Sequence, residues 1–179
     1  MYSVKRWVSD MGETSRYDGL TMGEAGNLWL PLLPGTYALV LTASRGLEIS
    51  VGRLGRLTVQ PGCYVYVGSA LGPGGLARRV GRHAAAEKKC RWHIDYLTTL
   101  ATLDEVWYTV DKARRECQWA GVLKQVRGAT VPLEGFGTSD CRCRSHLFFF
   151  RKRPSPRVFR QQVRHSIGGH GPIRAVRSR

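Results

Sequence analysis

Residues 35–42 have the sequence Gly-Thr-Tyr-Ala-Leu-Val-Leu-Thr, and residues 63–68 have the sequence Cys-Tyr-Val-Tyr-Val-Gly. Within them, residues 36–42 and 63–67 are rich in β-branched and aromatic residues and are bounded by glycine and other turn-forming residues, which is typical of β-strands. Two shorter alternating runs, at 47–51 and 54–59, lie between them and are separated by Gly52. This part of the chain is therefore predicted to form a set of strands.

The hydrophobic period changes after residue 70. Apolar side chains at helical spacing predict helices, over 76–86, 92–100 and 115–126. Two further β-rich runs predict strands over 105–110 and 146–150, with loops before and between these elements. This order favours an α+β fold, in which helices pack against a small, mainly antiparallel sheet.

Three segments are expected from the patterning. Residues 1–34 form an N-terminal extension, with Trp29 and Leu30 packing onto the domain. Residues 35–150 form the domain, and residues 151–179 form a basic, flexible tail that begins where Pro154 and Pro156 break the chain.

The composition excludes several classes of protein. Hydrophobic residues make up 42% of the 179 residues, which is enough to bury a core and argues against wholesale disorder. No apolar run approaches the roughly 20 residues that a membrane-spanning helix needs, and we expect neither a secretory signal nor a membrane partner. Five cysteines, an odd number, argue against a disulfide framework and indicate a reducing, cytoplasmic compartment.

The charge is strongly positive. The chain carries 28 lysines and arginines against 13 acidic residues, a net charge of +15. Residues 151–179 alone hold nine basic side chains and no acidic one. Such a surface attracts polyanions, of which nucleic acid is the commonest inside cells.

Two tyrosines and a basic helix could supply chemistry on such a polyanion. Tyr37 and Tyr66 each lie beside a glycine near the end of a predicted strand, and Arg79 and His83 share one face of the predicted helix 76–86. Hydrolysis of a phosphodiester needs groups that hold the phosphate, neutralise developing charge and deprotonate a water. Two core tyrosines and a solvated basic helix would give the same pattern without any activity.

The ordered set of motifs resembles the GIY-YIG nuclease superfamily. The resemblance rests on Gly-Thr-Tyr at 35–37, Tyr-Val-Gly-Ser-Ala at 66–70 and Leu-Ala-Arg-Arg-Val-Gly-Arg-His at 76–83. The stretches at 68–76, 91–97 and 136–148 further resemble its Uri-type branch, which is related to the excision-repair incision nuclease and to intron-encoded endonucleases. Thr36 and Val67 replace the two isoleucines of the superfamily motifs and change no catalytic group.

The resemblance implies a fold, an activity and a set of roles. The fold is a small, mainly antiparallel three-stranded sheet core flanked by helices. The activity is a divalent-metal-dependent hydrolysis of phosphodiester bonds in DNA. Because the sequence shows no second DNA-reading motif such as a zinc finger or helix-turn-helix, we expect little sequence specificity, and we expect no obligate protein partner. Tyr37 activates water, Tyr66 orients that network, Arg79 stabilises charge at the phosphate, and His83 is a fourth catalytic candidate. Alternatives are an RNA nuclease and a non-catalytic nucleic-acid-binding module of the same fold.

The resemblance also requires a glutamate on a later helix to bind Mg²⁺ or Mn²⁺. Glu116 lies on the apolar face of the predicted helix 115–126, where a carboxylate is costly unless it meets a cation. A single carboxylate suffices for Mg²⁺, which keeps several waters. Asp95 is the alternative ligand, and a salt bridge from Glu116 to an arginine such as Arg79 is the alternative to metal binding.

Further polar residues are expected to contact nucleic acid, most of them basic side chains that bind phosphates without choosing a sequence. They are Ser69, Arg78, Arg82, Lys88, Lys89, Arg91, His93, Arg151, Lys152 and Arg153.

Cys141, Cys143 and His146 raise the question of a zinc site. Structural zinc needs four ligands, and the fourth could come only from the distant Cys63, Cys90 or Cys117. A Cys-x-Cys pair is also tighter than the usual ligand spacing. We therefore favour a loop that lines the active site, with Ser139, Asp140 and His146 as its candidate polar groups.

Overall fold

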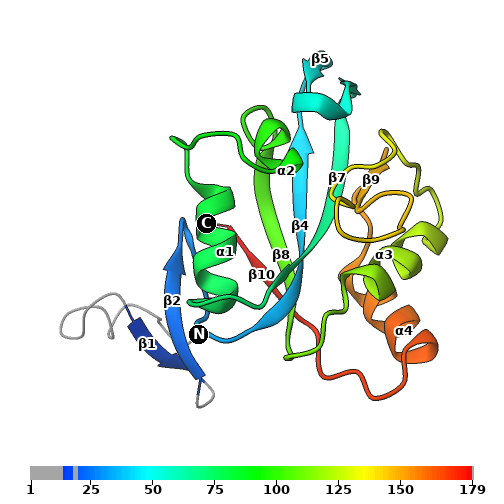
Figure 1. Ribbon diagram of the computed structural model, residues 1–179. Coiled ribbons are helices and arrows are strands. Elements are labelled where there is room, and N and C mark those ends of the chain that lie inside the picture. Colours follow the sequence, from blue (N-terminus) through cyan, green and yellow to red (C-terminus); the bar gives the residue numbers. More distant parts are fainter. Residues whose placement is uncertain (1–13, 18–19, 179) are drawn as a thin grey trace, which may run out of the picture.

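The computed structural model describes residues 14–17 and 20–178 (Figure 1). Its centre is an antiparallel sheet of five strands in the order β10-β8-β4-β7-β9. The strands are β4 (Gly35–Ala43), β7 (Gly62–Ala70), β8 (Thr102–Val110), β9 (Leu147–Phe150) and β10 (Arg174–Arg177). The predicted α+β class is confirmed, but the sheet has five strands where three were expected, because β9 pairs with β7 and β10 pairs with β8.

The alternation of side chains along β4 creates two cores, because successive residues of a strand point to opposite faces. Tyr37 and Leu39 pack in one core with α1 (Gly75–Ala84) and α2 (His93–Leu97). Ala38 and Val40 pack in the other core, with α3 (Glu116–Gln125) and α4 (Pro156–Ser166). Figure 1 shows α1 and α3 on opposite sides of the sheet.

The N-terminal region adds a second, three-stranded sheet of β1 (Thr14–Tyr17), β2 (Leu20–Ala25) and β3 (Leu28–Pro31), which lies beside α1. Leu30 is fully buried, as expected, whereas Trp29 is 44% exposed. The expected extension also includes residues 1–13, which lie outside the described residues. A hairpin of β5 (Leu47–Ser50) and β6 (Arg56–Val59) encloses a short 3₁₀ turn at Gly52–Leu54.

The basic C-terminal segment, expected to be a flexible tail, carries α4 and β10. Phe159 of α4 is buried with its ring centroid 5.1 Å from that of Trp107 and 5.1 Å from that of Trp119. Val163 and Ile167 follow at helical spacing and are also buried. The segment departs from the expectation because its arginines occupy the outer face of an amphipathic helix, while its few apolar residues close the second core.

No helix among the described residues has both the length and the apolar character needed to cross a membrane.

Replacing Phe159 with alanine tests how firmly α4 is attached. Removing a buried phenylalanine costs about 3–5 kcal/mol, so we expect Phe159→Ala to lower the free energy of unfolding by that amount in urea denaturation. Val158→Ala is the matched control, because Val158 is its exposed neighbour on the same helix and should change stability by less than about 0.5 kcal/mol. A loss below about 1 kcal/mol for Phe159→Ala would show that α4 is dispensable for the core.

Candidate active site

The two tyrosine–glycine motifs meet across the β4–β7 pair, where Tyr37 lies opposite Gly68. A Cβ atom on Gly68 would come within 2.5 Å of the Tyr37 hydroxyl oxygen. Only glycine at this position therefore lets the Tyr37 ring lie across the neighbouring strand. Gly35 is constrained in the same way, since a Cβ there would come within 2.2 Å of the Thr109 carbonyl oxygen on β8.

The Tyr37 hydroxyl is joined to α1 by a hydrogen bond of 2.9 Å to Nε2 of His83. Nδ1 of His83 lies 3.2 Å from Oδ1 of Asp95 on α2. All three side chains are buried. An ionised carboxylate can only accept, so this network assigns the proton to Nδ1 of His83 and makes Nε2 the acceptor from the Tyr37 O–H.

Asp95 is the anchor of this chain of hydrogen bonds. Its side chain is fully buried and accepts from the Arg82 guanidinium at 3.0 and 3.1 Å, and from the backbone N–H groups of Arg91 and Trp92 at 3.0 and 2.9 Å. Burial alone would raise the pKa of Asp95, but these donors and His83 together hold it well below its usual range. Asp95 stays ionised, and its oxygens are occupied, so the alternative that it binds the divalent metal is not supported.

Burial shifts the pKa values of Tyr37, Tyr66 and His83 so that the neutral form of each side chain is favoured. Burial raises the pKa of Tyr37 and of Tyr66 well above the usual value, although the charge of Arg79 opposes this in both cases. Burial lowers the pKa of His83, and the attraction of Asp95 only partly offsets it. Neither tyrosine is therefore a phenolate at neutral pH.

The rings of Tyr37 and Tyr66 both lie against His83, and we call this pair the tyrosine wall. The ring centroids of Tyr66 and His83 are 6.4 Å apart in an edge-on arrangement, and Phe136 packs on the other side of Tyr66 at 6.0 Å. The 132–144 loop thus reaches the site through Phe136 and not through the polar groups that were expected to line it. Ser139 and Asp140 are exposed, and Asp140 pairs with Arg114 at 2.6 Å.

Arginines and a tryptophan form a groove beside this wall. The guanidinium carbons of Arg79 and Arg82 lie 4.5 and 3.8 Å from the Trp92 ring centroid, close enough for cation–π attraction. The groove continues to the loop before α1 and is lined by Ala70, Gly72, Pro73, Gly75, Arg78, Arg79, Arg82 and Trp92. Three positive charges and an aromatic surface suit a nucleic-acid strand.

Glu116 is the first residue of α3 and is only 6% exposed. It accepts a hydrogen bond from the hydroxyl of Ser69 on β7, and its other oxygen lies 3.4 Å from Nε of Arg114. Arg114 is 56% exposed, so this ion pair is weak. Its partner is thus Arg114 and not Arg79, and the carboxylate suits a hard cation that keeps most of its waters.

The sheet explains how residues from its two faces reach one place. β9 pairs only with Cys63–Tyr66 of β7, and the Val67 N–H donates to the His146 carbonyl oxygen beyond the end of that ladder. Among the described residues no strand covers the last part of β7 on this side. Tyr66 on one face and Ser69 with Glu116 on the other therefore lie along the same open edge, and the charge of Glu116 contributes to the raised pKa of Tyr66 after burial.

The predicted nucleic-acid contacts fall into three groups, namely side chains near the groove, side chains with partners inside the protein, and the three basic residues after β9. Arg78, Lys89 and Arg91 are exposed around the groove, and Lys88 lies there too, although its ammonium donates to the His83 carbonyl oxygen. His93 instead accepts from the Gly137 N–H at 3.0 Å and packs on Phe136. Arg82 and Ser69 are partners of Asp95 and Glu116.

Arg151, Lys152 and Arg153 lie away from this group. They follow Phe150, which pairs with Cys63 at the start of β7, whereas Ser69 is six residues further along, about 20 Å in a strand. Arg153 pairs with Asp104 near the start of β8. They therefore lie apart from the groove, and their contact with nucleic acid stays a prediction.

Sequence reasoning missed Trp92, Phe136 and the anchoring role of Asp95. The stretch 91–97 resembled the Uri-type motif as a block, but only the fold shows that Asp95 faces His83 and that Trp92 faces the arginines of α1. The signal that could have indicated Asp95 is its position three residues after Trp92, which places its carboxylate at the N-terminus of the short helix.

A protein-family model described as "Domain of unknown function DUF123" matches residues 36–168, which span β4 to the end of α4. Neither the search of curated proteins nor that of solved structures finds a match.

The burial of His83 has a consequence that NMR titration can measure. We expect the pKa of its imidazole to lie below 6.5, because burial lowers it more than Asp95 raises it. The unfolded chain takes up this proton at about 6.5, so neutral His83 contributes stability that is present above that pH and is lost as the pH falls below it. The His83→Gln variant assigns the resonance. A pKa above 6.5 would show that the attraction of Asp95 dominates instead.

Proposed function

The chain belongs to the DUF123 family, a domain of unknown function, and from the geometry of its site we propose that it is a divalent-metal-dependent endonuclease of the GIY-YIG type that hydrolyses phosphodiester bonds in DNA. The observation that carries this proposal is the hydrogen-bonded series Tyr37–His83–Asp95, which opens toward Tyr66, Arg79 and Glu116. For the proposal we take the three central strands of the five-stranded sheet, β8-β4-β7, as the counterpart of the superfamily core. The odd number of cysteines favours a cytoplasmic location in this proposal.

Tyr37 serves as a proton relay in this proposal. Its O–H donates to Nε2 of His83, which leaves the oxygen lone pairs to accept from a water. As that water attacks phosphorus, its proton passes to the Tyr37 oxygen while the Tyr37 proton passes to His83. Asp95 then stabilises the imidazolium, as a buried carboxylate does for the base in other hydrolases. The raised pKa of Tyr37 favours this relay over a standing phenolate.

In the proposal, the negative charge that develops at the phosphate is stabilised by Arg79 and by a metal ion held by Glu116. The Arg79 guanidinium lies over Trp92 and acts on both tyrosines electrostatically, so it is placed to neutralise the oxygens of a phosphate bound at the groove. Glu116 would hold the divalent ion, which supplies further charge stabilisation when bound. The Ser69 hydroxyl keeps the Glu116 carboxylate oriented toward the open edge of β7.

The groove supports a nucleic-acid substrate, and DNA as the type of nucleic acid rests on the resemblance. In the proposal Arg78 and Arg79, which line the groove, contact backbone phosphates, and such contacts do not select a base sequence. DNA is the proposed substrate, and cleavage with little sequence preference is expected.

A cleavage assay with Mg²⁺ on single-stranded DNA, duplex DNA and RNA tests the proposal. We expect wild-type protein to cut DNA and Glu116→Gln to lose cutting while its affinity for DNA is retained, because the carboxylate is needed for the metal and not for the groove. Glu48→Gln is the matched control, since Glu48 is exposed on the distant β5–β6 hairpin. Cutting of RNA alone would change the substrate class, and binding without cutting of any substrate would leave a nucleic-acid-binding module.

Two neighbouring arginines of α1 separate catalysis from binding. We expect Arg79→Ala to lower the single-turnover rate at saturating DNA by roughly 10²–10³, the cost of removing one preorganised charge-stabilising donor. Arg79→Lys should restore little, because an ammonium lacks the fork of the guanidinium. Arg78→Ala should mainly weaken DNA affinity, because Arg78 is exposed at the rim of the groove. The assignment of Arg79 fails if Arg78→Ala slows the chemical step more.

A further inference from the structure

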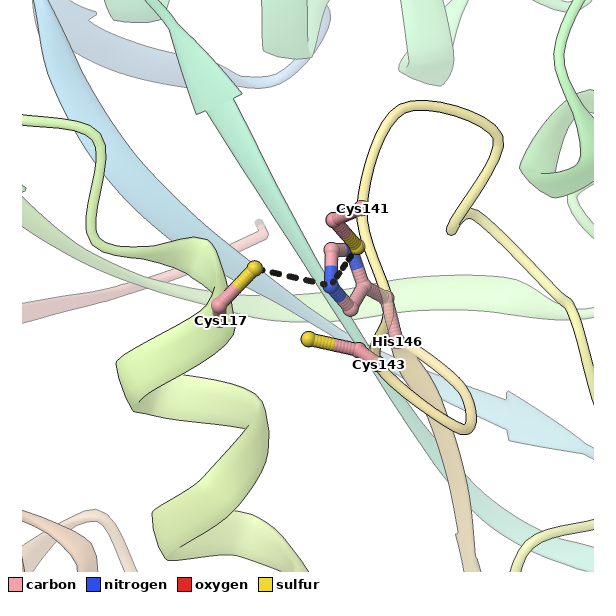
Figure 2. A group of neighbouring side chains, drawn as sticks. All are labelled: Cys117, Cys141, Cys143 and His146. Atoms are coloured by element: carbon pink, nitrogen blue, oxygen red, sulfur yellow. Dashed lines mark hydrogen bonds between the residues drawn. The ribbon is translucent and has the colours of Figure 1, made fainter.

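Three cysteines and a histidine from two distant segments converge beside α3 (Figure 2). Cys117 lies in the first turn of α3, Cys141 and Cys143 lie in the loop that precedes β9, and His146 immediately precedes β9. One donor atom from each lies within 4.8 Å of the other three. Nε2 of His146 is 3.5 Å from Sγ of Cys141 and 3.9 Å from Sγ of Cys117.

These distances match a particular coordination geometry. Zinc binds sulfur at about 2.3 Å and nitrogen at about 2.0–2.1 Å with tetrahedral angles. Two ligand atoms on such a centre are therefore about 3.5–3.8 Å apart. The two distances from His146 Nε2 lie close to this range, and all four donor atoms lie within 4.8 Å of one another. One ion at their centre would therefore meet them after modest side-chain movements.

The backbone that carries the four donors is held on several sides. The His146 N–H donates to the Phe136 carbonyl oxygen at 2.8 Å, and its own carbonyl oxygen accepts from Val67 at 2.9 Å. The Cys141 N–H donates to the Thr138 carbonyl oxygen at 3.2 Å. The ion pair of Arg114 and Asp140, at 2.6 Å, links the same two segments beside the cluster.

We propose that Cys117, Cys141, Cys143 and His146 form a structural zinc site. Three thiolates and one imidazole are an established donor set for structural zinc, and four protein ligands leave no position for a substrate or water. Soft sulfur ligands select zinc over Mg²⁺, whereas the carboxylate of Glu116 has the opposite preference. The two sites therefore bind different ions, although their ligands are adjacent in the sequence.

The sequence favoured a loop that lines the active site with Ser139, Asp140 and His146. The proposed zinc site replaces that interpretation. The Cys-x-Cys spacing is tighter than usual for zinc ligands, but residues 141 and 143 lie in irregular backbone, where side chains two apart can face the same way. The missing fourth ligand is Cys117, one of the three distant cysteines that the sequence left open.

The site has an evident structural use. Residues 131–146 contain no helix or strand, and irregular loops of this length are uncommon in compact domains without a function or a fastening. Zinc would fasten this loop, which supplies Phe136 to the tyrosine wall, to the turn of α3 that supplies Glu116. The proposal concerns a structural ion and does not depend on nuclease activity.

Metal analysis of the purified full-length protein tests the proposal without nucleic acid. We expect about one zinc per chain by elemental analysis, and about the same for Cys90→Ser, whose exposed thiol lies outside the cluster. Cys143→Ser should bind Zn²⁺ at least about 100-fold more weakly in competition with a chromophoric chelator, since losing even an outer-shell partner costs 10–100-fold.

A spectroscopic measurement on the wild-type chain covers the case in which Cys143→Ser does not fold. Co²⁺ added to the metal-free protein should give the thiolate charge-transfer absorption and the intense visible bands of a tetrahedral cobalt site, and Zn²⁺ should remove them. Octahedral-type weak bands would overturn the proposal. So would a disulfide among the three cysteines by mass spectrometry, iron in place of zinc, or unchanged Zn²⁺ affinity in folded Cys143→Ser.

Discussion

The buried charge of Asp95 is the constraint on which the site depends. An isolated carboxylate inside a protein costs several kcal/mol, and Asp95 is fully buried. Donors from α1, from the loop before α2 and from α2's own N-terminus surround it. A charge-assisted hydrogen bond contributes about 1.5–3 kcal/mol, so these donors together are able to offset the cost of burial. Asp95 and its donors therefore form one connected unit.

Several features of the site follow from that unit. An ionised Asp95 fixes the His83 tautomer, and the tautomer makes Nε2 the acceptor for Tyr37. Arg82 pairs with the same carboxylate and lies over the Trp92 ring, which also faces Arg79. Arg82 is thus a positioning residue, although its place in the basic row of α1 suggested a phosphate contact. Gly68 supplies the remaining condition, because only a missing side chain leaves room for the Tyr37 hydroxyl.

Local pattern predicted much of the fold, because strand and helix signals are properties of neighbouring residues. The predicted strands at 36–42 and 63–67 and the helices at 76–86 and 115–126 correspond to β4, β7, α1 and α3 with ends shifted by a few residues. Helix α4 and strand β10 were missed as parts of the domain because their arginines outweigh their apolar residues in any local average. Only the pocket between Trp107 and Trp119 shows that Phe159 belongs to the core.

The chemistry of the site was less accessible from sequence, because it depends on contacts between distant residues. Tyr37, Tyr66, Arg79, His83 and Glu116 are brought to one region, and their roles as nuclease residues stay predictions. The sequence does not show whether Asp95 is a metal ligand or a hydrogen-bond partner, since a carboxylate near a histidine suits both roles. Cys117 lies far from Cys141 in the chain, so spacing rules for zinc ligands could not join them.

Glu116, the proposed ligand of the catalytic metal, and Cys117, a proposed zinc ligand, are neighbours in the sequence. Both residues lie in the first turn of α3, but Glu116 is buried against Ser69 while Cys117 faces the loop before β9. Residues one apart on a helix point about 100° away from each other, so one turn can present a hard oxygen ligand to β7 and a soft sulfur ligand to the loop. A zinc ion on Cys117 would fix the rotation of α3 about its axis, and that rotation sets where the Glu116 carboxylate lies. The structural ion would thereby determine the position of the proposed catalytic ligand without taking part in the reaction.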